Sequence, residues 1–273
     1  MTQQIKRVIV PLDASSETAT AIDTAARLAA RWRVQLHGVF IEDEELIDLA
    51  GLPFARQVSL GAGIEPLTRD HVEDHFRAFA ERARHELAAA AGRHGVKWSF
   101  EVVRGPPASD TLGGEEDFVV AGAESRPIGD HFRVASRSWS WMAVVARPFL
   151  LAKCRWETGG SVFTLLRRRD PKSARVLELA AQIAGFRSGS LTVAGGPDLA
   201  GSDDFAAWVA QLLEGHSLTL QTEPAGTEPA TLRQRITELD CRLFVLEAGE
   251  RDAQEGELRE FVEQLTCDVL IVG

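Results

Sequence analysis

The chain has 273 residues, of which 45% are hydrophobic and 26% charged, a globular balance with room for two domains of ordinary size. Its net charge of -10 opposes binding to DNA, RNA or anionic lipid, so we expect neither a nucleic-acid nor a membrane partner. The three cysteines are widely spaced and form no C-x-x-C pair, which excludes a disulfide framework and a cysteine zinc cage. With no secretory signal and no long apolar run, the sequence predicts a soluble cytoplasmic protein.

The first half of the chain alternates short apolar runs with helical patterns. Small and aliphatic residues recur along one face of 17–32, and a second, longer helix is predicted near 69–91. Strands alternating with helices indicate right-handed parallel crossovers and a doubly wound α/β sheet. The predicted strands are 7–12, 34–41, 96–105, 117–122 and 148–152.

The second half repeats this plan. At an offset of 155 residues, "TAARLA" of the first helix matches "LAAQIA", and the apolar face is copied position for position. The match favours a tandem duplication, with one domain over 1–153 and a more divergent one over 160–273. The predicted strands are 160–166, 190–196, 217–222, 242–249 and 268–273, and the predicted helices are 172–186, 203–214, 229–239 and 256–266.

"VIVPLDASSETATAIDTAARLA", the strand "LHGVFIED" and the closing "RPFLLA" resemble the universal stress protein family. The resemblance covers nearly all of 5–152 and, more faintly, 160–273, as in a tandem, two-domain member. It implies a five-stranded parallel sheet of order 3-2-1-4-5, flanked by helices, in each domain. It further implies a stress-related regulatory role, pairing of the two domains within the chain, homodimer formation, and ATP or AMP as ligand in many members.

The resemblance also implies a nucleotide site at the carboxyl ends of the first strands. Asp13, directly after Pro11 and Leu12, matches the aspartate that contacts the nucleotide, and Ile41 matches the aliphatic residue that lies against adenine. In the family, the phosphates rest on a loop of pattern G-x2-G-x9-G-[ST], at a helix start whose free N–H groups attract anions. The matching positions here are Gly122, Ser125, Ala135 and Ser136.

Two glycines of that phosphate loop are replaced, by Ser125 and by Ala135. A side chain at such a position disfavours the left-handed backbone by ~1 kcal/mol, so the two losses weaken a phosphate cradle roughly ten- to a hundredfold. Arg126, Arg133 and Arg137 offer phosphate contacts in compensation.

The second half departs further from the family pattern. At the offset of 155, Arg168 takes the place of Asp13, and "LEAGERDAQEGEL" keeps no phosphate-loop register. We therefore expect this half to be a pairing partner rather than a nucleotide site. Three functions stay open for the chain: a nucleotide-binding regulator without enzyme activity, a nucleotide-independent interaction scaffold, and a weak ATPase.

Other patterns have simpler interpretations. His71 and His75 share a helical face at a zinc-compatible spacing, but no third ligand is evident and a solvated face is favoured; no metal site is expected. The basic run 167–169 is interpreted as solvent-exposed and neighboured by Asp170, with an anion site as the alternative. The long segment 43–67 is interpreted as a short helix plus a loop on the domain's own surface, or as a lid or partner contact.

Overall fold

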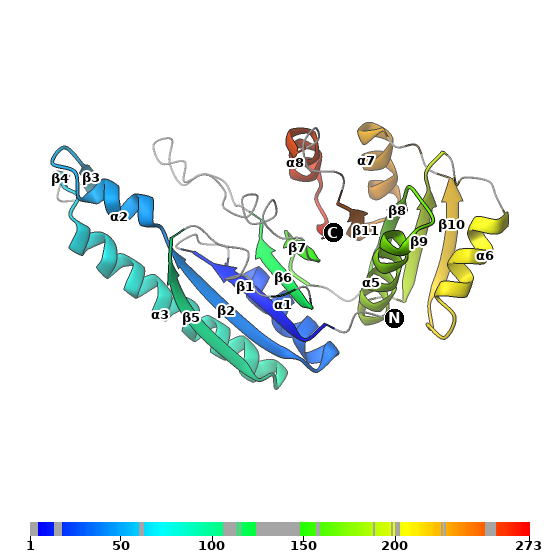
Figure 1. Cartoon of the computed structure of the whole chain (residues 1–273), viewed down its shortest axis with the longest axis horizontal. Coiled ribbons are helices and arrows are strands. Elements are labelled where there is room, and N and C mark those ends of the chain that lie inside the picture. The colour runs from blue at the N-terminus through cyan, green and yellow to red at the C-terminus, as the bar shows by residue number, and fades with distance from the viewer. Residues whose placement is uncertain are drawn as a thin grey trace.

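The structure is a computed structural model of the whole chain (Figure 1). Within the part that it describes, no helix combines the length and the apolar character needed to cross a membrane. The described residues are 5–13, 18–59, 63–105, 114, 116–123, 148–156, 159–187, 189–197, 199, 203–224, 226, 228–248 and 255–273.

The first half forms five parallel strands in the order β5-β2-β1-β6-β7, which is the predicted order 3-2-1-4-5. Thr68 caps the longest helix, α3, by accepting from the His71 N–H, and Gly95 ends it in the left-handed conformation at φ 66°. The elements are β1 (Arg7–Leu12), α1 (Thr18–Trp32), β2 (Gln35–Glu42), α2 (Glu44–Ala50), β3 (Arg56–Ser59), β4 (Gly63–Pro66), α3 (Arg69–His94), β5 (Trp98–Arg104), β6 (Asp117–Gly122) and β7 (Phe149–Ala152).

The second half repeats the same order with its own five parallel strands, β10-β9-β8-β11-β12. The predicted fold class, two tandem doubly wound α/β halves, is therefore confirmed, and the strand boundaries differ from the predicted ones by two residues or fewer. The elements are β8 (Ser161–Leu166), α5 (Pro171–Arg187), β9 (Ser190–Gly195), α6 (Asp203–Leu212), β10 (Thr219–Pro224), α7 (Pro229–Glu238), β11 (Cys241–Glu247), α8 (Glu255–Gln264) and β12 (Asp268–Val272).

The two half-sheets join edge to edge into one ten-stranded sheet (Figure 1). The join is an antiparallel pair of β7 with β12, in which Leu150 lies opposite Leu270. All residues of both strands are buried, so the seam between the halves belongs to the core. The sequence predicts two sheets but contains no local signal for their union.

One hydrophobic layer lies on each face of this sheet, and both layers run across the seam. The first layer receives the apolar faces of α1, α2, α3, α5 and α6, and the second receives those of α7 and α8. Trp32 of α1 links the halves on the first face: its indole Nε1 donates to Gln182 Oε1 at 3.0 Å, and its ring contacts Phe118 and Phe186.

The repeat is offset by different amounts in its first strand and its first helix. Val8 and Val162 face the same hydrophobic layer, which sets β8 at an offset of 154 from β1. Ile22 and Leu177 are the matching buried residues of α1 and α5, at the predicted offset of 155. The second half therefore has one additional residue between its first strand and its first helix.

The segment 43–67 contains more regular structure than the predicted helix plus loop. Asp43 caps α2 by accepting from the Leu46 N–H at 3.1 Å, and β3 and β4 then form an antiparallel hairpin. The hairpin lies at the left end of the molecule in Figure 1, away from the second half. Phe54 and Ile64 are 72% and 73% exposed there.

Candidate functional site

The carboxyl ends of β1, β2 and β6 meet at one edge of the first half-sheet. Parallel strands point the same way, and the order 3-2-1-4-5 makes the chain leave β1 toward one side and β6 toward the other. In open α/β sheets, ligands bind at such a reversal, in the crevice outside the carboxyl ends of the two strands. Asp13 follows β1 directly at this edge and is partly buried.

The strand register brings the predicted adenine-side residues together. Pro11 is paired with Val39 of the neighbouring strand, so two residues further along Asp13 stands level with Ile41. Ile41 is only 1% exposed and packs in the second hydrophobic layer, the same layer as Ala121 of β6. Ile41 is thus buried below this edge of the sheet and is not part of its exposed surface.

Gly122 is the last residue of β6 and is paired with Ala152 of β7. It lies on the other side of the crevice from Ile41, because β1 separates β2 from β6. Four of the predicted site residues, Pro11, Asp13, Ile41 and Gly122, therefore occupy three adjacent strand ends. The remaining three, Ser125, Ala135 and Ser136, lie outside the described residues.

A cluster of charged side chains that the sequence analysis missed fixes the outer rim, at the ends of β2 and β5. Arg104 contacts Glu42 at 2.9 Å and Glu73 of α3 at 3.2 Å. The hydrogen bond to Glu42 raises the pKa of Arg104, so the guanidinium stays charged. The next residue, Gly105, turns the chain at φ 101° and donates its N–H to the Glu42 carbonyl. Arg104 thus links the ends of β2 and β5 to α3 on this side of the edge.

The corresponding edge of the second half is closed by carboxylates. By the strand offset, Arg167 and not the predicted Arg168 stands level with Asp13. Asp170 accepts from the Ser173 N–H at 2.8 Å at the start of α5, and this hydrogen bond lowers the pKa of Asp170. Glu247, at the end of β11, accepts from the Ser173 hydroxyl at 3.2 Å. Two negative charges therefore occupy the helix start where an anionic ligand would bind.

The histidine pair on α3 and the basic run 167–169 are both exposed to solvent. His71 and His75 are both exposed on α3, as the solvated-face interpretation predicts. Arg168 is exposed and lies 3.7 Å from Asp170, as expected for the basic run 167–169. Throughout the described ranges, no group of three or more His, Cys, Asp or Glu side chains is arranged to hold a metal ion.

Solved structures with the same architecture span almost the whole chain. A universal stress protein from Archaeoglobus fulgidus DSM 4304 is 13% identical, with a TM-score of 0.68 over 99% of this chain and 97% of that one. A putative universal stress protein from Pseudomonas aeruginosa UCBPP-PA14 is 16% identical, with a TM-score of 0.62 over 99% and 94%. The chain has the universal stress protein fold. No family model and no curated protein matches the sequence.

A third similar structure, a functionally unknown protein from Pseudomonas aeruginosa PAO1, has 17% identity and a TM-score of 0.61 over 99% of this chain and 93% of that one. The chain described here aligns with nearly the full length of all three similar chains. The universal stress protein fold is thus shared across both halves.

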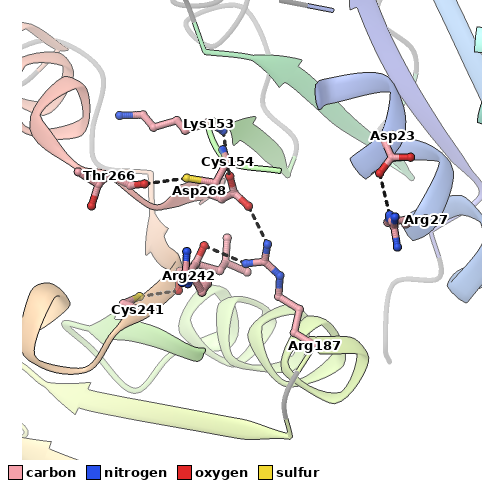
Figure 2. A network of polar contacts seen from close by, with 10 residues as sticks. Asp23, Arg27, Lys153, Cys154, Arg187, Cys241, Arg242, Thr266 and Asp268 are labelled. Atoms are coloured by element: carbon pink, nitrogen blue, oxygen red, sulfur yellow. Dashed lines mark hydrogen bonds and ion pairs between the residues drawn. The ribbon is translucent and has the colours of Figure 1, made fainter. Parts of the chain in front are cut away.

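A second polar cluster lies at the seam, around the first residue of β12 (Figure 2). Asp268, the first residue of β12, accepts from the backbone N–H groups of Lys153 and Cys154 at 2.9 and 3.0 Å. Its other oxygen accepts from Arg187 at 2.9 Å, and the same guanidinium donates to the Arg242 carbonyl at 2.8 Å. The Asp268 and Arg187 side chains are 1% and 2% exposed.

Burial raises the pKa of Asp268, and Arg187 opposes that rise by stabilising the carboxylate. The Arg187 guanidinium also lies over the Trp156 ring, 4.2 Å from its centroid. The cluster therefore connects α5, the start of β12 and the linker between the halves. The only sequence signal for it is an aspartate opening an otherwise apolar strand, which indicates a buried charge but not its partner.

Proposed function

We propose that the chain is a stress-related regulatory protein that binds an adenine nucleotide, ATP or AMP, at the carboxyl edge of its first half. The observation that carries the proposal is the asymmetry between the two crevices. The first half places Asp13 and Gly122 on either side of the strand-order reversal. In the second half Arg167 stands level with Asp13, and Asp170 and Glu247 bind Ser173 at the start of α5.

The chemistry at Asp13 suits the sugar or base of a nucleotide rather than its phosphates. An ionised carboxylate only accepts hydrogen bonds, and ribose hydroxyls and the adenine amino group donate them. Glu42 is paired with Arg104, and Asp43 adds negative charge on the β2 side of the edge, which repels phosphate. The phosphates are therefore assigned to the β6 side, beyond Gly122, the direction in which Ser125, Ala135 and Ser136 follow in sequence.

The second half acts in this proposal as a structural partner. It contributes β12 to the edge of β7 and fixes the linker through Asp268. A nucleotide acts as a ligand that shifts the conformation or partner choice of the chain, with no chemical turnover. Homodimer formation of the whole chain is part of the same proposal.

Isothermal titration calorimetry with ATP, ADP and AMP tests the nucleotide site, using Asp13→Ala and the matched control Arg168→Ala. A hydrogen bond to a charged group is worth about 1.5–3 kcal/mol, so Asp13→Ala should weaken binding by roughly ten- to a hundredfold. Arg168→Ala should leave the affinity unchanged, because Arg168 belongs to the closed second crevice. Equal losses in the two variants would contradict the assignment to the first half.

A nucleotide-independent interaction scaffold is the second candidate, and the exposed apolar side chains of 43–67 favour it. Leu49, Leu52, Phe54 and Ile64 are all exposed on or beside the β3–β4 hairpin. The absence of binding heat for every nucleotide at high micromolar concentration would support this candidate over the first.

A weak ATPase is the enzymatic alternative. It needs a group that activates water and a way to hold Mg²⁺, and Asp13 is the one carboxylate that the sequence analysis assigns to the nucleotide. Phosphate release under saturating ATP and Mg²⁺ distinguishes it: the regulatory proposal expects no release above the rate of a buffer control.

A further inference from the structure

The three cysteines, distant in sequence, all lie near the start of β12 or of its neighbour β11. Cys241 is the first residue of β11, Cys267 immediately precedes β12, and Cys154 lies in the linker after β7. The Cys154 thiol donates to the Thr266 carbonyl at 2.8 Å, and its N–H donates to Asp268 (Figure 2). Cys154 thus contacts the residues before and after Cys267.

Cys241 and Cys267 form a direct pair. Their strands are parallel neighbours in the sheet, with Leu243 opposite Asp268, so both residues lie at the same end of the sheet. Both side chains are buried in the second hydrophobic layer, where the Cys241 thiol donates to the Leu243 carbonyl at 3.1 Å, and the two sulfurs are close enough for each to shift the pKa of the other. Neighbouring thiols on one face of paired strands are within the range of side-chain separations that a disulfide requires.

The two thiols have different surroundings: Lys153 donates to the Val262 and Leu265 carbonyls just before Cys267, whereas the Cys241 thiol donates to the Leu243 carbonyl. The neighbouring Cys241 side chain lowers the pKa of Cys267, and the nearby Lys153 ammonium acts in the same direction. The neighbouring Cys267 side chain raises the pKa of Cys241. Cys267 is therefore the thiol that ionises first, and the thiolate is the form that reacts with oxidants.

We propose that Cys241 and Cys267 are a redox-active dithiol that forms a reversible intrachain disulfide when the protein meets a peroxide. The Cys267 thiolate attacks one peroxide oxygen, the O–O bond breaks, and Cys267 becomes a sulfenic acid while the leaving hydroxide takes a proton to become water. The Cys241 sulfur then attacks the Cys267 sulfur, the S–O bond breaks, and a second water leaves. Two thiols are oxidised by two electrons and one peroxide is reduced to two waters.

The position of the bond gives it a structural consequence. It joins the start of β11 to the start of β12 and so closes the crossover that contains α8. The Lys153 ammonium donates to the Val262 and Leu265 carbonyls at the end of that same crossover. Oxidation therefore restrains the β11–α8–β12 unit next to the linker between the halves.

Cys154 provides an internal control. It is more exposed than Cys241 and Cys267, but we do not expect peroxide to oxidise it. Burial raises the pKa of the Cys154 thiol, and its hydrogen is held by the Thr266 carbonyl. Exposure alone would predict Cys154 as the oxidised residue. The structure assigns oxidation to the two buried thiols instead.

The test treats the reduced full-length chain with hydrogen peroxide, stops the reaction with catalase, and counts free thiols in denaturant. The expected count falls from the chain's three thiols to one, and dithiothreitol restores all three. Non-reducing peptide mapping of the unaltered protein should join the Cys241 and Cys267 peptides, and Cys154→Ser should not affect this link. Cys241→Ala and Cys267→Ala, with their fold checked by circular dichroism, should each abolish it.

Three results would overturn the proposal. They are a disulfide that includes Cys154, a link between two chains, and a full thiol count after peroxide treatment. The peptide map of the unaltered chain decides among them even if an alanine variant fails to fold. Nucleotide titration plays no part in this experiment, so its outcome is independent of the proposed function.

Discussion

Asp268→Asn tests whether the buried ion pair holds the two halves together. The substitution keeps an oxygen to accept from the Lys153 and Cys154 N–H groups, but it leaves the Arg187 guanidinium buried without its counter-charge. Breaking one side of a buried pair costs about 3–5 kcal/mol, and the retained acceptor places the expected loss near the lower limit, about 3 kcal/mol. With a urea m-value of about 3 kcal/mol per molar, the unfolding midpoint should fall by about 1 M.

The matched control is Asp74→Asn, in an exposed ion pair with Arg77 on α3. Exposed pairs contribute up to about 1 kcal/mol, so its midpoint should move by about 0.3 M or less. Urea unfolding is followed by circular dichroism and by the fluorescence of the six tryptophans, one of which, Trp156, lies against Arg187 at the seam. Equal midpoint shifts for the two variants would refute the reasoning. The double change Asp268→Asn with Arg187→Met should recover much of the loss, because it leaves no buried charge unpaired and keeps the oxygen that accepts from the Lys153 and Cys154 N–H groups.

Two further predictions concern the crevices and the core. Asp170→Ala removes the N-cap of α5 and should cost about 0.5–2 kcal/mol at neutral pH in thermal or urea unfolding. The pKa of Asp170 is lower in the folded chain, so the stabilisation by its carboxylate is fully present above the unfolded value of 3.8 and is lost as the pH falls through the folded value. The difference in unfolding free energy between wild type and variant should therefore vanish in acid. A difference that stays constant with pH would contradict the assignment. Gly38→Ala would place a Cβ 2.7 Å from Leu87 Cδ2, so we expect an overpacking loss of about 1–3 kcal/mol, whereas Gly92→Ala, on open space, should not destabilise.

The sequence predicts the strands and helices well because burial on both faces of a parallel sheet leaves continuous apolar runs, such as 7–12 and 268–273. It also places Asp13 correctly at a strand end, since the residue after a buried strand reaches the edge of the sheet. The closed second crevice is partly predictable from its acidic residues, although the single-residue difference between strand and helix offsets shifts the match from Arg168 to Arg167.

The seam could not be predicted in the same way. Asp268 contacts the linker at Lys153 and Cys154, and such long-range contacts leave no periodic pattern in the chain. The cysteines illustrate the same limit, because spacing along the sequence indicates three isolated residues and the fold gathers them. Local patterns determine which elements form, while the pairing of β7 with β12 depends on complementary edges that only exist once both halves have folded.

The β7–β12 pair has a consequence for how the chain came to be one polypeptide. Both strands are wholly buried, whereas the outermost strands, β5 and β10, carry many exposed residues along their length. A separated half would expose an apolar edge strand, which could pair with the same strand of another copy and cause aggregation. Covalent fusion supplies the correct neighbour at a high effective concentration, so the second half could lose its own ligand chemistry and still be retained as a permanent cover.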